Sequence, residues 1–262
     1  MSAGGLAVSA FPQNYPPATS GALSLVSAAF TAQGARPYNE DRLGRMDGGL
    51  WALADGLGGH KGGARAAEIA VQAGLASASH SAAPRLEERL KQAVSDAHAA
   101  VRAGHRSQPE LAGMRSTLVM LGVQQGELAW AHTGDSRLYH LRGGKLQWRT
   151  RDHSAVQLLV AAGEVAEADI PVHPDRSRLV SCLGGEKSLI ISARSAVPRA
   201  GDVLLLASDG LWEHFTDAEL ESVVGASASP EALLAALAAK VEATPHVNQD
   251  NYSGIAVFIG AV

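Results

Sequence analysis

The sequence predicts an α+β fold in which antiparallel sheets are covered by helices. Two observations lead to this prediction. Strand-like and helix-like segments come in blocks rather than in strict alternation, whereas a doubly wound parallel sheet needs one helix after each strand. There is also no internal repeat and no linker after residue 22, so we expect 23–262 to form one domain. With 262 residues and 46% hydrophobic content, the chain can bury a sizeable core.

The first half of the chain is predicted to contain two strands and two helices. Apolar residues favour strands over 23–31 and 49–54, with a polar turn at 39–41 between them. Leucine, valine and alanine recur at steps of three and four residues over 85–103, which predicts an amphipathic helix. The alanine-rich segment 63–79 is expected to form the neighbouring helix.

The middle of the chain reads as a β-rich block followed by a surface excursion. Between Ser116 and Arg149, four β-prone segments are separated by glycine-containing breaks, which predicts an antiparallel meander. A helix is expected around 153–162. The polar stretch 163–185 follows and is expected to run over the surface.

The last part of the chain is predicted to contain three strands and two helices. Strands are expected at 188–194, 202–207 and 254–260. Thr216 opens a capping-box pattern, which marks the start of a helix, and a serine–proline pair at 229–230 opens another.

Composition restricts the classes of partner and compartment. Lys and Arg total 22 against 26 acids, so a net charge of −4 argues against a nucleic-acid partner. Cys182 is the only cysteine, which excludes an intrachain disulfide and a Cys-based zinc site and suits a reducing cytoplasm. Residues 1–22 lack the features of a secretory signal, and no window is apolar enough to insert in a membrane. Their prolines predict a flexible tail.

Four acids stand at the ends of strand-like segments: Asp55, Asp135, Asp209 and Asp250. Each alone can be a simple turn residue, because Asp and Gly are common between strands. However, a carboxylate at the end of an apolar strand is costly to bury unless a positive group meets it. Four such acids without clustered basic residues would repel one another, which points to a bound metal cation.

These acids belong to an ordered series of motifs: RPYNED at 36–41, DGLGGH at 55–60, GDSR at 134–137, SDG at 208–210 and DN at 250–251. The series resembles the metal-dependent serine/threonine protein phosphatases of the type 2C (PPM) family, in particular the compact bacterial members. The resemblance runs from about residue 24 to the C-terminus. It implies a β-sandwich of two antiparallel sheets flanked by α-helices, a four-layer α-β-β-α arrangement.

The resemblance also implies a dinuclear Mn²⁺ or Mg²⁺ site in a cleft. By position, Asp55 would bridge the two cations and the carbonyl of Gly56 would complete the coordination of one of them. Asp209 and Asp250 would hold the other cation, and Glu40 would reach the site through a water molecule. Oxygen donors of this kind are the ligands that hard divalent cations prefer.

Three further positions have implied roles, and one departs from the family pattern. Asp41 would orient solvent beside the metals, Asp135 with Asp209 would bind a third, weaker metal, and Arg36 would clamp the substrate phosphate. Some family members carry a histidine as general acid where this chain has Leu57, so the general acid is left unassigned.

The implied activity is hydrolysis of phosphoserine and phosphothreonine in proteins by direct attack of a metal-bridging water. The enzyme would be a cytoplasmic monomer that opposes bacterial serine/threonine kinases. One alternative is a catalytically silent scaffold that binds phosphoproteins, although such a member would be expected to have lost Asp55, Asp209 or Asp250. Another is a two-metal hydrolase that acts on small phosphate esters or nucleic acid, and the acidic balance argues against nucleic acid.

Three further features lie outside the ligand set. The excursion 163–185 corresponds to the family's variable flap, where Arg176 and Arg178 either contact a phosphopeptide or stand in a solvated loop. Arg115 replaces a usual glycine and either alters the rim of the site or stands in solvent. His60 is expected to serve the structure rather than the chemistry.

Overall fold

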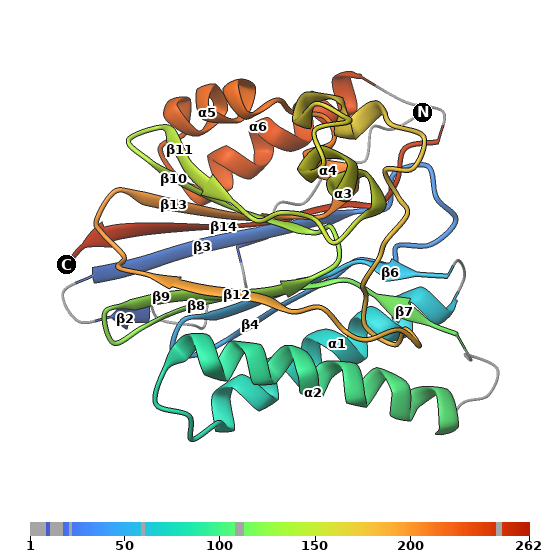
Figure 1. Cartoon of the computed structure of the whole chain (residues 1–262). Coiled ribbons are helices and arrows are strands. Elements are labelled where there is room, and N and C mark those ends of the chain that lie inside the picture. The colour runs from blue at the N-terminus through green and yellow to red at the C-terminus, as the bar shows by residue number, and fades with distance from the viewer. Residues whose placement is uncertain (1–8, 11–17, 21–22, 59–60, 108–112, 245–247) are drawn as a thin grey trace.

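The computed structural model describes the chain except residues 1–8, 11–17, 21–22, 59–60, 108–112 and 245–247. Two antiparallel sheets lie face to face, and a layer of helices covers the outer face of each (Figure 1). This is the four-layer α-β-β-α sandwich that the sequence and the family resemblance predict.

The two sheets have different strand orders. The first sheet runs β1-β3-β14-β13-β10-β11, with β2 also paired to β3, and the second runs β12-β9-β8-β5-β4. In the first sheet the bounds are β1 Ser9–Ala10, β2 Ala18–Ser20, β3 Leu23–Ala32, β10 Arg137–Arg142, β11 Lys145–Arg149, β13 Asp202–Ala207 and β14 Tyr252–Ala261. In the second they are β4 Arg42–Met46, β5 Leu50–Ala54, β8 Leu118–Gln124, β9 Glu127–Thr133 and β12 Ser192–Ala196. A separate two-stranded ribbon pairs β6 Gly56–Leu57 with β7 Arg115–Ser116.

The helices divide between the two outer faces (Figure 1). The long helices α1 Lys61–His80 and α2 Leu86–Ser107 pack together on the second sheet. On the first sheet lie α5 Asp217–Ala226 and α6 Pro230–Ala243, together with the short α4 Asp209–Trp212. The helix α3 Ala155–Ala161 comes just before the flap 163–185, and the flap itself contains a 3₁₀ turn, η2 Glu167–Val172. No helix in the described part of the chain is long and apolar enough to cross a membrane.

Strand β5 shows why an uninterrupted apolar run suits this architecture. Successive side chains of a strand point to opposite faces of the sheet. Trp51 and Leu53 therefore enter the core between the sheets, whereas Leu50, Ala52 and Ala54 enter the core under α1 and α2. Since both faces of the strand are covered, every position in it is apolar.

The predicted meander between Ser116 and Arg149 was wrong. The hairpin β8–β9 belongs to the second sheet and the hairpin β10–β11 to the first, so the chain changes sheets between Thr133 and Arg137. Gly134 permits the crossing: its φ is +97°, and a Cβ there would lie 2.7 Å from Thr117 Cγ2. Strand propensity cannot distinguish one four-stranded meander from two hairpins in facing sheets, because the partner of each strand is set by tertiary packing.

Two regions expected to lack strands contain them. Within the predicted tail 1–22, β1 and β2 pair with the edge of β3 opposite to β14, which satisfies edge groups that would otherwise be unpaired. The other tail residues lie outside the described part of the chain. The sequence analysis also missed β4, whose half-buried residues show no clear alternation. Gly44 in β4 allows α1 to approach closely, since a Cβ there would lie 2.4 Å from Val71 Cγ1.

The expected helices and most of the remaining strands are observed with small shifts at their ends, whereas the strand expected at 188–194 begins four residues later, as β12 at Ser192–Ala196. The capping box at Thr216 is present, with its hydroxyl accepting from the Glu219 amide and the Glu219 side chain bonded to the Thr216 amide. The excursion 163–185 is a surface segment only in its first part. Its second part returns to the core, where Leu183 is fully buried and bridges to Ser116.

Candidate metal centre

Five carboxylates stand where strands begin or end. Asp41 precedes β4, Asp55 follows β5, Asp135 lies in the crossing between β9 and β10, Asp209 begins α4 after β13, and Asp250 precedes β14. Strands β13 and β14 are paired, with Ala207 opposite Gly254, so the acids that flank them meet at one edge. Sheet pairing thus gathers residues that are far apart in sequence.

One cleft of about 430 Å³ collects most of the predicted site. Six predicted residues line it: Arg36, Glu40, Asp55, Gly56, Asp209 and Asp250. A second hollow of about 520 Å³ shares Arg36, Asp209, Asp250 and Ser177 with it and extends toward the flap. Asp41 and Asp135 do not line the cleft but are buried near it, with exposed fractions of 2% and 5%.

The carboxylates are close enough to perturb one another. Burial raises the pKa of Asp55 well above its usual range, and the charges of Asp41, Asp209 and Asp135 raise it further. Burial and the charge of Asp250 raise the pKa of Asp209 to about 6, despite a hydrogen bond with Asp55. The pKa of Asp135 is also well above its usual range, first because of burial and then because of Asp209. Clustered carboxylates with raised pKa values are stabilised either by protonation or by a bound cation.

Only one of the two carboxylate oxygens of Asp41 accepts a hydrogen bond from the described residues. The Ser208 hydroxyl donates to its Oδ2 atom at 2.8 Å, while its Oδ1 atom is buried and accepts no hydrogen bond from any described residue. Burial and the charge of Asp209 raise the pKa of Asp41 to about 7. A buried carboxylate oxygen without a donor is costly in protein alone. It suits a position that faces ordered solvent or a cation.

The backbone around Asp55 is fixed from both ends. Its amide donates to Thr117 Oγ1 at 2.9 Å, and its carbonyl accepts from Ser116 Oγ and from the Thr117 amide, each at 2.8 Å. Gly56 next to it is required by space, because a Cβ there would lie 2.2 Å from the carbonyl oxygen of Gly63. The carboxylate is therefore presented by a rigid main chain.

The donor set fits a hard divalent cation, because it consists of carboxylate and carbonyl oxygens. Within the described residues, no three His, Cys, Asp or Glu side chains are already grouped as ligands of one ion. Two of the carboxylates instead face protein donors. Arg36 Nη2 donates to Asp250 Oδ2 at 2.6 Å, and the Gly210 amide donates to Asp209 Oδ1 at 2.6 Å. Arg36, the predicted phosphate clamp, thus forms an ion pair with Asp250, a predicted metal ligand.

Two residues near the cleft were given no role in the sequence analysis: Asn251, which lines the cleft, and Glu213, which lines the second hollow. The Asn251 side chain accepts from the Glu40 amide and donates to the Gln33 and Tyr38 carbonyls, so it fixes the loop that carries Arg36. Its place directly after Asp250 was the available signal. Glu213 lies one helical turn after Asp209, and burial together with the Asp209 charge raises its pKa to about 7.

The structure also places the two flap arginines and Leu57. Arg176 lines the second hollow and pairs with Glu213 at 3.2 Å, whereas Arg178 lines neither hollow. Leu57 lines the cleft, and its aliphatic side chain cannot act as a general acid. His60 lies outside the described residues.

The chain was compared with known families and structures. The family model described as Protein phosphatase 2C matches residues 35–244. The serine/threonine protein phosphatase PstP of Mycobacterium tuberculosis is 36% identical over 201 residues, which are 75% of this chain and 37% of that protein. The chain therefore spans well under half the length of this relative. The serine/threonine phosphatase stp of Listeria monocytogenes is 31% identical over 72% of this chain and 78% of its own length.

Solved structures agree with the sequence comparison. A crystal structure of the M. tuberculosis phosphatase PstP/Ppp superposes with a TM-score of 0.78 at 31% identity, covering 89% of this chain and 98% of that one. The catalytic domain of PstP in complex with two manganese ions has a TM-score of 0.78 at 29% identity, covering 91% and 99%. With the matched sandwich and the acid-lined cleft at its strand ends, this chain belongs to the protein phosphatase 2C family.

Proposed function

We propose that this protein is a metal-dependent phosphatase that hydrolyses phosphoserine and phosphothreonine in proteins. The observation that supports this most strongly is the cleft where Asp55, Asp209 and Asp250 meet beside Arg36. The named activity of the relatives PstP and stp is the same. A silent scaffold would have no reason to keep this group of mutually repelling acids.

Two divalent cations, Mn²⁺ or Mg²⁺, are the proposed cofactors, as two manganese ions accompany the PstP catalytic domain. Asp55 and the carbonyl of Gly56 would hold one cation, with Asp55 shared, and Asp209 and Asp250 would hold the other. Glu40 would act through a water molecule. When bound, the cations supply Lewis acidity and a water of lowered pKa.

The residues buried behind the cleft support this ligand set. Asp41, with one unsatisfied oxygen, would orient solvent toward the cations. Asp135, whose pKa responds to Asp209, would help Asp209 to hold a third, weaker cation.

Arg36 is the proposed phosphate clamp, and its pair with Asp250 is suited to exchange. The two side chains are 52% and 41% exposed, and ion pairs this accessible to water contribute little stability. A phosphoryl group can therefore replace the carboxylate as the partner of the guanidinium. The forked donors of arginine then bind two phosphoryl oxygens and hold the phosphorus in the cleft.

We also propose the wider organisation. Residues 23–262 form a single catalytic domain with 163–185 as the flap, and the strands β1 and β2 from the segment 1–22 add to the first sheet of that domain. The protein acts as a monomer in the cytoplasm on phosphoproteins and opposes a serine/threonine kinase.

The test is hydrolysis of a phosphothreonine peptide with Mn²⁺, with Mg²⁺ and with a chelator. Asp209→Asn should lose nearly all turnover, because the substituted side chain no longer supplies a charged ligand. Asp47→Asn is the matched control, since Asp47 is exposed and lies away from the cleft. Metal-independent turnover, or an active Asp209→Asn variant, would contradict the proposal. Peptide binding without turnover in the wild type would indicate a scaffold instead.

A further inference from the structure

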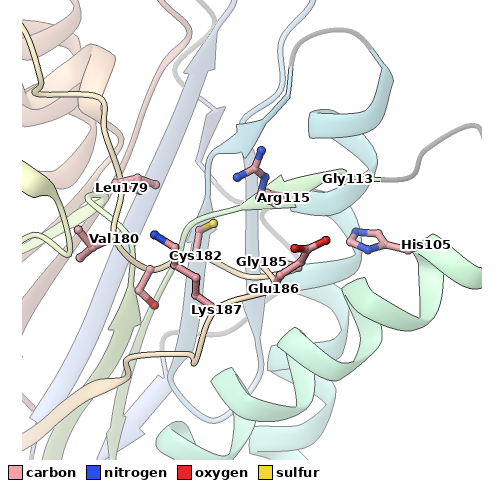
Figure 2. Close-up of a pocket in the computed structure, with 11 residues that line it drawn as sticks. His105, Gly113, Arg115, Leu179, Val180, Cys182, Gly185, Glu186 and Lys187 are labelled. Carbon is pink, nitrogen blue, oxygen red and sulfur yellow. The ribbon is translucent and has the colours of Figure 1, made fainter.

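A separate pocket of about 440 Å³ opens between the end of α2, strand β7 and the chain segment 179–187 (Figure 2). Its polar side chains include Arg115, Lys187, Glu186 and His105. None of the residues that line it also lines the catalytic cleft or the hollow beside it. We call it the Arg115 pocket.

The walls of the Arg115 pocket are held in place by hydrogen bonds. The Leu183 amide donates to the Ser116 carbonyl at 2.8 Å, and the Gly184 amide donates to His98 Nδ1 at 3.2 Å. His105 Nε2 lies 2.7 Å from the Met114 carbonyl. Gly184 has φ +76°, and a Cβ there would lie 2.6 Å from the same carbonyl. The pocket is therefore largely preformed, as binding sites usually are.

The Arg115 pocket carries two positive groups that no described carboxylate pairs with. No described acid lies within 4.0 Å of the Arg115 guanidinium or the Lys187 ammonium, and both residues are exposed. In Figure 2 the carboxylate of Glu186 and the ammonium of Lys187 extend to opposite sides of the pocket. Burial raises the pKa of the Cys182 thiol, so this neighbour of Arg115 stays neutral. Among the described residues, the lining has two cations against one carboxylate, in a chain whose net charge is −4.

Two segments connect the Arg115 pocket to the catalytic cleft. Arg115 pairs across the β6–β7 ribbon with Leu57, and Leu57 lines the cleft. Paired strands lie about 5 Å apart, so the two sites are neighbours on one ribbon. The chain from Ser177, in the cleft, to Leu179, at the pocket, makes the second connection. A peptide leaving the cleft on this side would pass the pocket.

We propose that the Arg115 pocket binds an acidic side chain of the phosphoprotein substrate, about three to five residues to one side of the phosphorylated residue. An extended peptide advances about 3.3 Å per residue, so this separation spans about 10–17 Å. This length matches the distance from the cleft to the Arg115 pocket, which is one strand spacing plus the reach of the side chains. Arg115 and Lys187 are then specificity residues that act on binding, and the inference rests on the proposed phosphatase activity.

The test is a series of phosphothreonine peptides with alanine flanks and one aspartate moved from position −6 to +6. For the wild type we expect aspartate at adjacent positions on one side to raise kcat/KM about threefold to tenfold through KM. This is the range expected for two exposed ion pairs, and it should shrink in 0.5 M salt. In the double variant Arg115→Gln/Lys187→Gln, the ratio of kcat/KM for the aspartate peptide to that for the alanine peptide should fall to about one.

Arg194→Gln is the matched control and should keep the wild-type ratio. Arg194 is also an exposed arginine on a strand, and it lines neither the Arg115 pocket nor the cleft. Lys187→Glu should push the ratio below that of the double variant, because it places a like charge beside the aspartate. A wild type indifferent to the aspartate, or a double variant that keeps the preference, would overturn the inference. Turnover of a small aryl phosphate with Mn²⁺ separates these outcomes from failure of the proposed function, in which that substrate is also left intact.

Discussion

Asp152→Asn should destabilise the protein far more than an ordinary surface substitution. Asp152 accepts two hydrogen bonds from Arg137, at 2.8 and 2.7 Å, and both residues are about 5% exposed. The Arg137 guanidinium also lies 3.4 Å from the centre of the Trp212 ring. Removing one partner leaves a charge buried without compensation, for which we expect a loss of about 3–5 kcal/mol in the free energy of unfolding. Urea unfolding at pH 7 measures it.

The same pair also permits a sharper test. Because desolvation opposes a buried ion pair, Arg137→Met/Asp152→Leu should be less destabilised than Asp152→Asn alone. Glu68→Gln, which breaks the exposed pair of Arg65 and Glu68, is the control and should change stability by less than about 0.5 kcal/mol. A loss below about 1 kcal/mol for Asp152→Asn would refute the reasoning, since it would mean that the buried guanidinium finds another partner or water.

Three further predictions concern acid sensitivity, the cleft and a helix start. Burial and the neighbouring His132 hold the pKa of His153 at about 4, below its ordinary 6.5, so only the unfolded chain takes up this proton between those values. Stability should fall by about 2 kcal/mol between pH 7 and pH 5 from this group, and His153→Gln should remove that slope in urea unfolding. Gly56→Ala should abolish the rise in Tm on adding Mn²⁺, as read by calorimetry, because the new Cβ displaces the main chain beside the ligands. Thr216→Ala should cost about 1 kcal/mol in urea unfolding through loss of the cap; no change would show that the helix end is satisfied otherwise.

Local sequence patterns predicted those elements whose structure depends on neighbouring residues in the chain. The period of α2 and the capping box at Thr216 both appear as predicted. The division of the expected meander into two sheets was not predictable, since Gly134 signals a turn but not the sheet that follows it. Strand β4 was missed because its pairing with β5, rather than its own composition, makes it a strand.

In the candidate site, too, the sequence predicted individual residues but not the contacts that depend on the tertiary fold. Asp55, Asp209 and Asp250 could be proposed from their positions at strand ends, and one cleft contains all three. The contact between Arg36 and Asp250 joins loops 214 residues apart, so no local pattern encodes it. The surroundings of Arg115 depend likewise on the pairing of β6 with β7, which no propensity describes.

The hydrogen-bonded backbone at Asp55 affects how the protein would respond to a changing supply of metal ions. Since the Ser116 and Thr117 hydroxyls and the Thr117 amide hydrogen-bond to the main chain of Asp55, the geometry of this main chain is set during folding and does not wait for an ion. Loading and unloading would then proceed without any rebuilding of the loop. Activity would then follow the cellular pool of divalent ions within the lifetime of one folded molecule.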